Sequence, residues 1–178
     1  MCNTSSFLPP RQATIAVVGL GKIGLPLAVQ YARHGCRVIG CDINPHVVET
    51  INAGKAHIQE ETGLAESVAD LVTQGLLSAT GDTGAAVREA GIIVVIVPVI
   101  IDTQHRPDFT PIDAATRAIG AGLQPGTLII YETTVPVGTT AGRVAPLLEQ
   151  TSQLKAGQDF YLAFSPERVS SGHIFRDL

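Results

Sequence analysis

The feature that most constrains the fold is an apolar segment that runs directly into a glycine-rich loop. Residues 14–18 read Thr-Ile-Ala-Val-Val, and Gly19, Gly21 and Gly24 follow in the pattern G-x-G-x-x-G. Such a run predicts a buried strand, and the loop predicts the turn from that strand into a helix. The first glycine permits the turn, the second lets the backbone approach a pyrophosphate, and the third lets the helix pack closely. We therefore expect the loop, with Lys22 and Ile23, to bind a dinucleotide on the free N–H groups of the helix.

An acidic residue after the second apolar segment narrows the expected cofactor to NAD. Residues 37–41 predict a strand, and Asp42 follows it, eighteen residues after Gly24. A carboxylate at that position suits the ribose hydroxyls of NAD and repels the 2′-phosphate of NADP. The alternative is that Asp42 is only a solvated turn or cap residue. Asn44 and Pro45 are expected to begin the next helix, as its N-cap and first position, so Asp42 is not needed for capping.

Composition excludes several classes of protein. The 178 residues are 45% hydrophobic and 16% charged, which suits roughly one domain with a buried core. The net charge of −4 and the absence of a Lys/Arg cluster disfavour a nucleic-acid surface. The longest apolar run, residues 92–101, is about half a membrane span and contains Pro98. We expect a cytoplasmic protein that does not enter a membrane, with a disordered leader over residues 1–12, which lack signal-peptide features.

The cysteines and histidines do not form a metal-binding pattern. Cys2, Cys36 and Cys41 make no C-x-x-C pair, and the five histidines stand apart from one another. Cys36 and Cys41 are an odd number of residues apart on a predicted strand and should point to opposite faces. We expect reduced, structural thiols and no metal.

Strand and helix signals alternate along the chain, which is typical of an α/β fold. Residues 99–110 are expected to form a polar loop, Thr110 to cap the helix after it, and Pro146 to kink the next helix or mark its start. The expected strands are 14–18, 37–41, 77–80, 92–97, 128–131 and 160–164, and the expected helices are 23–34, 45–53, 65–74, 85–90, 110–122 and 141–150. This pattern predicts one Rossmann domain over residues 13–178, a doubly wound parallel sheet of six strands in the order 3-2-1-4-5-6 with helices on both faces.

Two polar segments follow the fifth and sixth predicted strands, where ligands bind in such folds. Residues 132–140 read Glu-Thr-Thr-Val-Pro-Val-Gly-Thr-Thr, and residues 165–169 read Ser-Pro-Glu-Arg-Val. The first suits recognition of a polar ligand, although a strand-to-helix turn with threonine caps would look the same. The second places a carboxylate beside a guanidinium, and its alternative is a surface ion pair. Neither alternative is excluded by these residues alone.

Together with the glycine loop, these segments resemble the N-terminal NAD-binding domain of the UDP-glucose/GDP-mannose dehydrogenase family. The resemblance covers nearly all of the chain after residue 12, and the Ser-Pro-Glu-Arg-Val form is similar to the branch that acts on UDP-N-acetylhexosamines such as UDP-N-acetylmannosamine. It implies oxidation of the C6 hydroxyl of a UDP-sugar to the uronate in two NAD-dependent steps, through intermediates on a cysteine. It also implies that the full-length protein is a homodimer or a larger oligomer.

The resemblance also implies roles for individual residues. Thr134 would position a water or the reacting oxygen, and Glu167 would act as general base or orient water for thioester hydrolysis. The implied cofactor contacts in this part of the chain are Val97, Pro98, Glu132 and Thr133. The segment Glu-Thr-Gly-Leu at 61–64 resembles the family's Glu-Pro-Gly-Leu, so Glu61, Gly63 and Leu64, together with Arg168, are the implied substrate contacts.

Three departures from the family pattern limit these roles. Ser171 stands where the UDP-glucose branch has a second acid, and Val99-Ile100 replaces Thr-Pro after the fourth predicted strand. The family's nucleophilic cysteine lies in a Gly-Gly-x-Cys-x-Pro motif, which this chain lacks. We therefore expect a cofactor-binding part, without the family's central helix and UDP-sugar domain, that binds NAD but does not turn over UDP-sugars alone.

Two other functions remain open on the sequence. The chain could be part of a two-domain dehydrogenase of the 6-phosphogluconate or 3-hydroxyacyl-CoA type, although residues 132–140 disfavour this. It could also be a free-standing NAD-binding or sensing module without catalysis.

Overall fold

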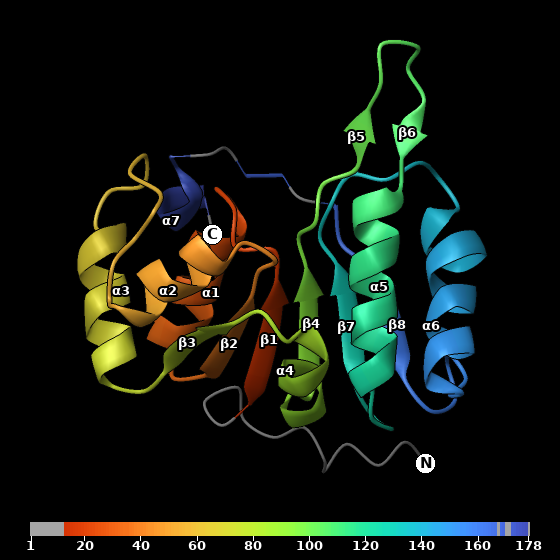
Figure 1. Cartoon of the computed structure of the whole chain (residues 1–178), viewed down its shortest axis with the longest axis horizontal. Coiled ribbons are helices and arrows are strands. Elements are labelled where there is room, and N and C mark those ends of the chain that lie inside the picture. The colour runs from red at the N-terminus through yellow and green to blue at the C-terminus, as the bar shows by residue number, and fades with distance from the viewer. Residues whose placement is uncertain (1–12, 167, 170–171, 178) are drawn as a thin grey trace.

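A parallel sheet of six strands forms the centre of the molecule (Figure 1). The computed structural model describes residues 13–166, 168–169 and 172–177, so the predicted leader and Glu167 lie outside the described residues. The strand order is β3-β2-β1-β4-β7-β8, and all five pairings are parallel. The strands are β1 (Thr14–Val18), β2 (Arg37–Cys41), β3 (Leu77–Thr80), β4 (Ile92–Val95), β7 (Leu128–Tyr131) and β8 (Tyr161–Phe164). The predicted doubly wound order is confirmed.

Helices cover both faces of this sheet, as expected for a Rossmann fold. Alternate residues of β1 enter different buried clusters, with Val17 on one face and Val18 on the other. The first face is covered by α1 (Gly24–Arg33), α2 (Pro45–Asn52) and α3 (Leu64–Thr73), and the second by α4 (Thr83–Glu89), α5 (Thr110–Gly122) and α6 (Ala145–Ser152). Cys36 and Cys41 are buried in different clusters, so their predicted opposite orientation is confirmed. Among the described residues, no helix has the length and apolar character needed to cross a membrane.

Short polar side chains fix the starts of several helices. Asn44 caps α2, because its Oδ1 accepts a hydrogen bond from the N–H of His46 at 3.0 Å. The predicted cap of α5 is wrong. Thr110 is the first residue of that helix, and its own N–H donates to Oδ1 of Asp108 at 2.9 Å. The earlier carboxylate therefore takes the role expected of the threonine hydroxyl.

The predicted loop at 99–110 is also wrong, because it contains a β-hairpin that protrudes above the sheet in Figure 1. Its antiparallel strands are β5 (Ile100–Ile101) and β6 (Pro107–Asp108). Asp102 shapes the turn by accepting hydrogen bonds from the N–H groups of Gln104 and Arg106. These bonds, with the Arg106 guanidinium, hold the pKa of Asp102 below its ordinary value.

The last part of the chain differs from the prediction in two places. The expected helix at 141–150 starts as a π-helical turn, η3 (Thr140–Val144), and Pro146 marks the start of α6. A short helix, α7 (Ile174–Asp177), follows where no element was expected.

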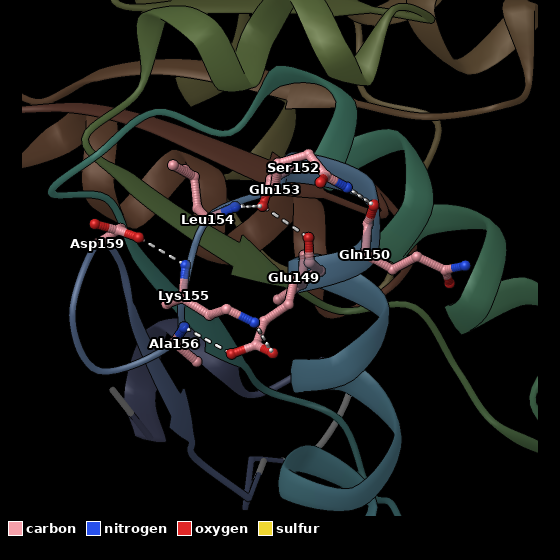
Figure 2. Close-up of polar contacts among 9 residues, drawn as sticks. Glu149, Gln150, Ser152, Gln153, Leu154, Lys155, Ala156 and Asp159 are labelled. Carbon is pink, nitrogen blue, oxygen red and sulfur yellow. Dashed lines mark hydrogen bonds and ion pairs between the residues drawn. The ribbon is translucent and has the colours of Figure 1, made fainter.

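A set of polar contacts closes the connection between α6 and β8 (Figure 2). Glu149 accepts hydrogen bonds from the backbone N–H of Ala156 at 3.1 Å and from Nζ of Lys155 at 3.4 Å. The N–H of Lys155 donates to Oδ2 of Asp159 at 2.8 Å. Because this connection leads into the start of β8, it lies at the amino edge of the sheet. The cluster is therefore structural and remote from the carboxyl edge, where ligands bind in this fold.

Candidate functional site

Two adjoining pockets lie at the carboxyl edge of the sheet, one on each side of the glycine loop. The smaller pocket, of about 350 Å³, contains Lys22 and Thr134 in its wall. The larger pocket, of about 880 Å³, contains Asp42. Gly21, Ile96 and Pro98 line both pockets. The two pockets therefore adjoin at these three residues, one of which is the second glycine of the loop.

Packing explains why the loop needs glycine at its first and third positions. Gly19 has a φ of +95°, and a Cβ there would lie 2.6 Å from the carbonyl oxygen of Ile96. A Cβ on Gly24 would lie only 1.8 Å from the carbonyl oxygen of Gly19. Gly21 differs, because a Cβ would meet nothing within 4 Å and would project into open space. The second glycine therefore leaves bare backbone toward the site.

Asp42 connects the glycine loop to the end of β2. Its Oδ2 accepts a hydrogen bond from the N–H of Leu20 at 3.0 Å, and its Oδ1 accepts one from Asn44 at 2.9 Å. Asp42 therefore does act as a turn residue, which was the alternative interpretation of this position. An ionised carboxylate has about four acceptor positions, so two remain for ribose hydroxyls. Asp42 also lines the larger pocket, which suits the predicted cofactor contact.

Most other residues of the larger pocket were not predicted from the sequence. Ile43, which is 99% exposed, lines this pocket, and so does Arg88 of α4. Other parts of the wall come from the turn after β3, the start of α4 and one face of α5: Gly81, Asp82, Thr83, Gly84, Pro111, Ala114, Ala115, Ala118 and Ala121. The alanines at spacings of three and four on the helix 110–122 were the available signal, because they leave a groove along one helix face.

The smaller pocket brings together the predicted residues from the glycine loop and from the segment after β7. Glu132, Thr133 and Thr134 line it, and Thr133 is buried whereas Thr134 is exposed. Lys22 forms an ion pair of 2.6 Å with Glu60, and both side chains are largely exposed. Burial, with a smaller effect of the Glu132 charge, raises the pKa of Tyr31 to about 12. Of the other predicted cofactor contacts, Val97 lines the larger pocket, and Ile23 and Gly24 line the smaller one.

The predicted substrate contacts lie outside both pockets. The Glu61 carboxylate is buried and accepts hydrogen bonds from the N–H groups of Ile174 at 2.9 Å and Phe175 at 3.1 Å. Gly63 has a left-handed backbone at the start of α3, and the Leu64 side chain is buried in the core. Arg168 is exposed after β8.

The chemistry of the site fits a dinucleotide. Backbone N–H groups at the start of α1, a cation at Lys22 and a carboxylate at Asp42 are the groups expected around a pyrophosphate and a ribose. Within the described ranges, no group of three or more His, Cys, Asp or Glu side chains is placed to hold a metal ion.

Comparisons with known proteins agree with this geometry. Residues 13–178 match the UDP-glucose/GDP-mannose dehydrogenase family, NAD binding domain. The chain is 44% identical to an NDP-N-acetyl-D-galactosaminuronic acid dehydrogenase of Ralstonia solanacearum and 40% identical to a UDP-N-acetyl-D-mannosamine dehydrogenase of Escherichia coli K12, in each case over 93% of this chain. It covers only 39% and 40% of those relatives. A solved UDP-D-ManNAc dehydrogenase from Pyrococcus horikoshii superposes with a TM-score of 0.86 at 36% identity, over 92% of this chain and 38% of that one. The chain therefore belongs to the UDP-glucose/GDP-mannose dehydrogenase family, and it corresponds to the NAD-binding domain of that family.

Proposed function

We propose that this chain binds NAD across the two pockets, as the cofactor-binding part of a nucleotide-sugar 6-dehydrogenase. The observation that carries the proposal is that the two pockets adjoin at Gly21, where a side chain is absent and the space is open. The larger pocket, with Asp42, would hold the adenosine half. The smaller pocket, which reaches Glu132 and Thr134, would hold the nicotinamide half. Bound NAD supplies the hydride acceptor.

The chain's own residues would orient the cofactor and the reacting oxygen. Lys22 offers a positive charge to the pyrophosphate, and Glu132 and Thr133 form the wall at the nicotinamide end. Thr134, which is exposed and lines the same pocket, would hold a water or the substrate oxygen. Glu167 and Arg168, which follow β8, are proposed as the general base and a substrate contact.

We propose a UDP-N-acetylhexosamine as the substrate of the whole protein, oxidised at C6 to the uronate. The names of the relatives from Ralstonia and Escherichia support this class of sugar nucleotide. The covalent steps require a thiolate, and the described cysteines do not provide one. Cys36 and Cys41 are buried, and burial raises the pKa of Cys41 to about 12. The chain alone is therefore proposed to bind cofactor without turning over UDP-sugars.

Titration calorimetry with NAD and NADP tests the cofactor proposal directly. We expect one site per chain, with NAD bound more tightly than NADP, and absence of NAD binding would refute the proposal. Incubation of residues 1–178 with NAD and UDP-N-acetylmannosamine should give no NADH absorbance. Measurable NADH production would overturn the proposed inactivity of the isolated chain.

The other functions make different predictions. A 6-phosphogluconate or 3-hydroxyacyl-CoA type of enzyme would use a lysine or histidine base, and the smaller pocket contains a lysine only at Lys22, on the phosphate-binding loop. A free-standing sensing module would be encoded without the Gly-Gly-x-Cys-x-Pro motif downstream. Reading the coding sequence beyond residue 178 separates the dehydrogenase from the module. The cytoplasmic location and the homodimeric or larger state of the whole protein remain proposals, tested by fractionation and by light scattering.

A further inference from the structure

Arg88 brings a positive charge to the wall of the larger pocket that no described acidic side chain neutralises. It lies on α4 and is exposed, and the other charged groups on this wall are the carboxylates of Asp42 and Asp82. Within the ranges that the structure describes, its guanidinium makes no ion pair and donates no hydrogen bond. The guanidinium is therefore available to a ligand in the pocket.

The packing of α4 on α5 determines where this guanidinium lies. The two helices pack against each other (Figure 1), so closely that a Cβ on Gly122 would lie 2.2 Å from the carbonyl oxygen of Gly84. A Cβ on Gly84 would lie 3.8 Å from Nη1 of Arg88 and 3.6 Å from the carbonyl oxygen of Ala118 on α5. The guanidinium therefore lies against the start of α4, close to the α5 wall of the pocket.

The same part of the wall begins beside the position proposed for the ribose. A Cβ on Gly81 would lie 3.9 Å from the carbonyl oxygen of Asp42. Further along, Oδ1 of Asp82 lies 3.5 Å from the Cβ position of Gly84, which Arg88 also adjoins. That oxygen already accepts a hydrogen bond of 2.9 Å from the backbone of α4. Because adenine is joined directly to the ribose, a base that lies along this wall reaches the Arg88 guanidinium.

Adenine is a suitable partner for a guanidinium that has no anionic partner. A guanidinium is planar and weakly hydrated, and it is attracted to the face of an aromatic ring without needing a counter-charge. This chain already contains such a contact, because the guanidinium of Arg143 lies over the ring of Phe109, 4.4 Å from the ring centre. A 2′-phosphate would also attract Arg88, but it would have to lie beside the Asp42 carboxylate, which repels it.

We propose that Arg88 contacts the adenine of NAD, with its guanidinium stacked on one face of the base, and thereby sets how tightly the adenosine half binds. The inference rests on the proposed function, because it takes the larger pocket as the place of that half. It adds a contact for the base to the ribose contact at Asp42 and the phosphate contact at the glycine loop.

Replacement of Arg88 by alanine tests the contact, and a second arginine gives a matched control. Arg88→Ala should weaken NAD binding by about two- to thirtyfold, the range of a cation–π contact from an exposed to a desolvated site. The Tm should change little, because the side chain is exposed and has no described partner. Arg117 of α5 is also exposed but lines neither pocket, so Arg117→Ala removes the same charge and should leave the Kd for NAD unchanged.

Parts of the cofactor show which group Arg88 contacts. In calorimetry or NMR titration, Arg88→Ala should weaken ADP-ribose and adenosine by the same factor as NAD and should leave nicotinamide mononucleotide unaffected. Adenosine decides the matter, because it carries the base without any phosphate. If adenosine binding is unchanged while NAD and ADP-ribose lose affinity, Arg88 contacts a phosphate and the proposal is overturned.

Arg88→Lys separates stacking from charge alone. Lysine keeps the positive charge but lacks the planar group, so it should restore only part of the lost affinity. Complete recovery, together with a loss in Arg88→Ala that disappears at high salt, would assign the effect to charge and contradict the proposal. An equal loss in Arg117→Ala would do the same.

Failure of this inference differs visibly from failure of the proposed function. If the wild-type chain binds NAD and Arg88→Ala binds it within twofold as tightly, only the adenine contact is refuted. If the wild-type chain binds neither NAD nor ADP-ribose, the proposed cofactor function is refuted, and the adenine contact with it.

Discussion

Alanine at Gly24 and alanine at Gly21 should damage the cofactor site for opposite reasons. In Gly24→Ala, the new Cβ starts 1.8 Å from the carbonyl oxygen of Gly19, so the loop must move by about 1.2 Å to reach even 3.0 Å. A shift of Gly19 is opposed by its own hydrogen bond, because its N–H donates to the carbonyl oxygen of Cys41 at 2.8 Å. Overpacking of this kind costs about 1–3 kcal/mol, or roughly 2–12 °C in Tm for a domain of this size. Loss of one charge-assisted bond to the pyrophosphate would add about 1.5–3 kcal/mol, roughly 10- to 150-fold in the Kd for NAD.

In Gly21→Ala the methyl group meets no protein atom within 4 Å, so the unfolding free energy should stay within about 0.5 kcal/mol of wild type. The same methyl projects toward the space proposed for the phosphates, and NAD should bind at least about tenfold more weakly. Thermal unfolding and calorimetry of both variants measure the two effects separately. Gly91→Ala is the control, because its Cβ also meets nothing and the residue precedes β4, at the amino edge. Wild-type Tm in Gly24→Ala, or wild-type NAD affinity in Gly21→Ala, would refute the reasoning.

Three further predictions concern charge. Glu60→Gln should tighten NAD binding by up to about fivefold, because an exposed ion pair worth at most about 1 kcal/mol no longer competes for Lys22, and calorimetry at two salt concentrations would show this. Asp42→Asn should raise the affinity for NADP relative to NAD by about tenfold or more, since the charge that repels the 2′-phosphate is gone; an unchanged ratio would assign Asp42 to the turn alone. The raised pKa of Tyr31 means that the folded state keeps this proton longer than the unfolded chain, so its contribution to stability is complete below pH 10 and is lost as the pH rises toward 12. Tyr31→Phe should therefore flatten the alkaline decrease in unfolding free energy measured with urea, and an unaltered slope would contradict this.

The sheet was predictable because its signals are local and strong. The apolar runs gave each central strand, and the order followed from connections that alternate strand and helix. The turn chemistry at Asn44 and the opposite orientation of Cys36 and Cys41 likewise depend on near neighbours in the sequence.

The errors came from interactions that join distant positions or from elements too short to leave a periodic pattern. The hairpin strands β5 and β6 have two residues each, which is below the length at which alternation can be recognised. α7 has one turn and depends on Glu61, which no local pattern connects to residue 174. The groove on α5 was overlooked for a different reason, because alanines on a helix are usually interpreted as core or propensity rather than as open space.

The division of the site by Gly21 has a consequence for inhibitor design. A compound confined to the larger pocket would compete with the proposed cofactor while contacting mostly apolar walls, with Asp42, Asp82 and Arg88 among them, and it would not reach Lys22 or Thr134. Such a compound would gain affinity mainly by burying apolar surface, which other dinucleotide-binding pockets also offer. Selectivity over other dinucleotide enzymes would have to come from a group that extends past Gly21 into the smaller pocket, where Lys22, Glu132 and Thr134 offer charges and a hydroxyl to recognise.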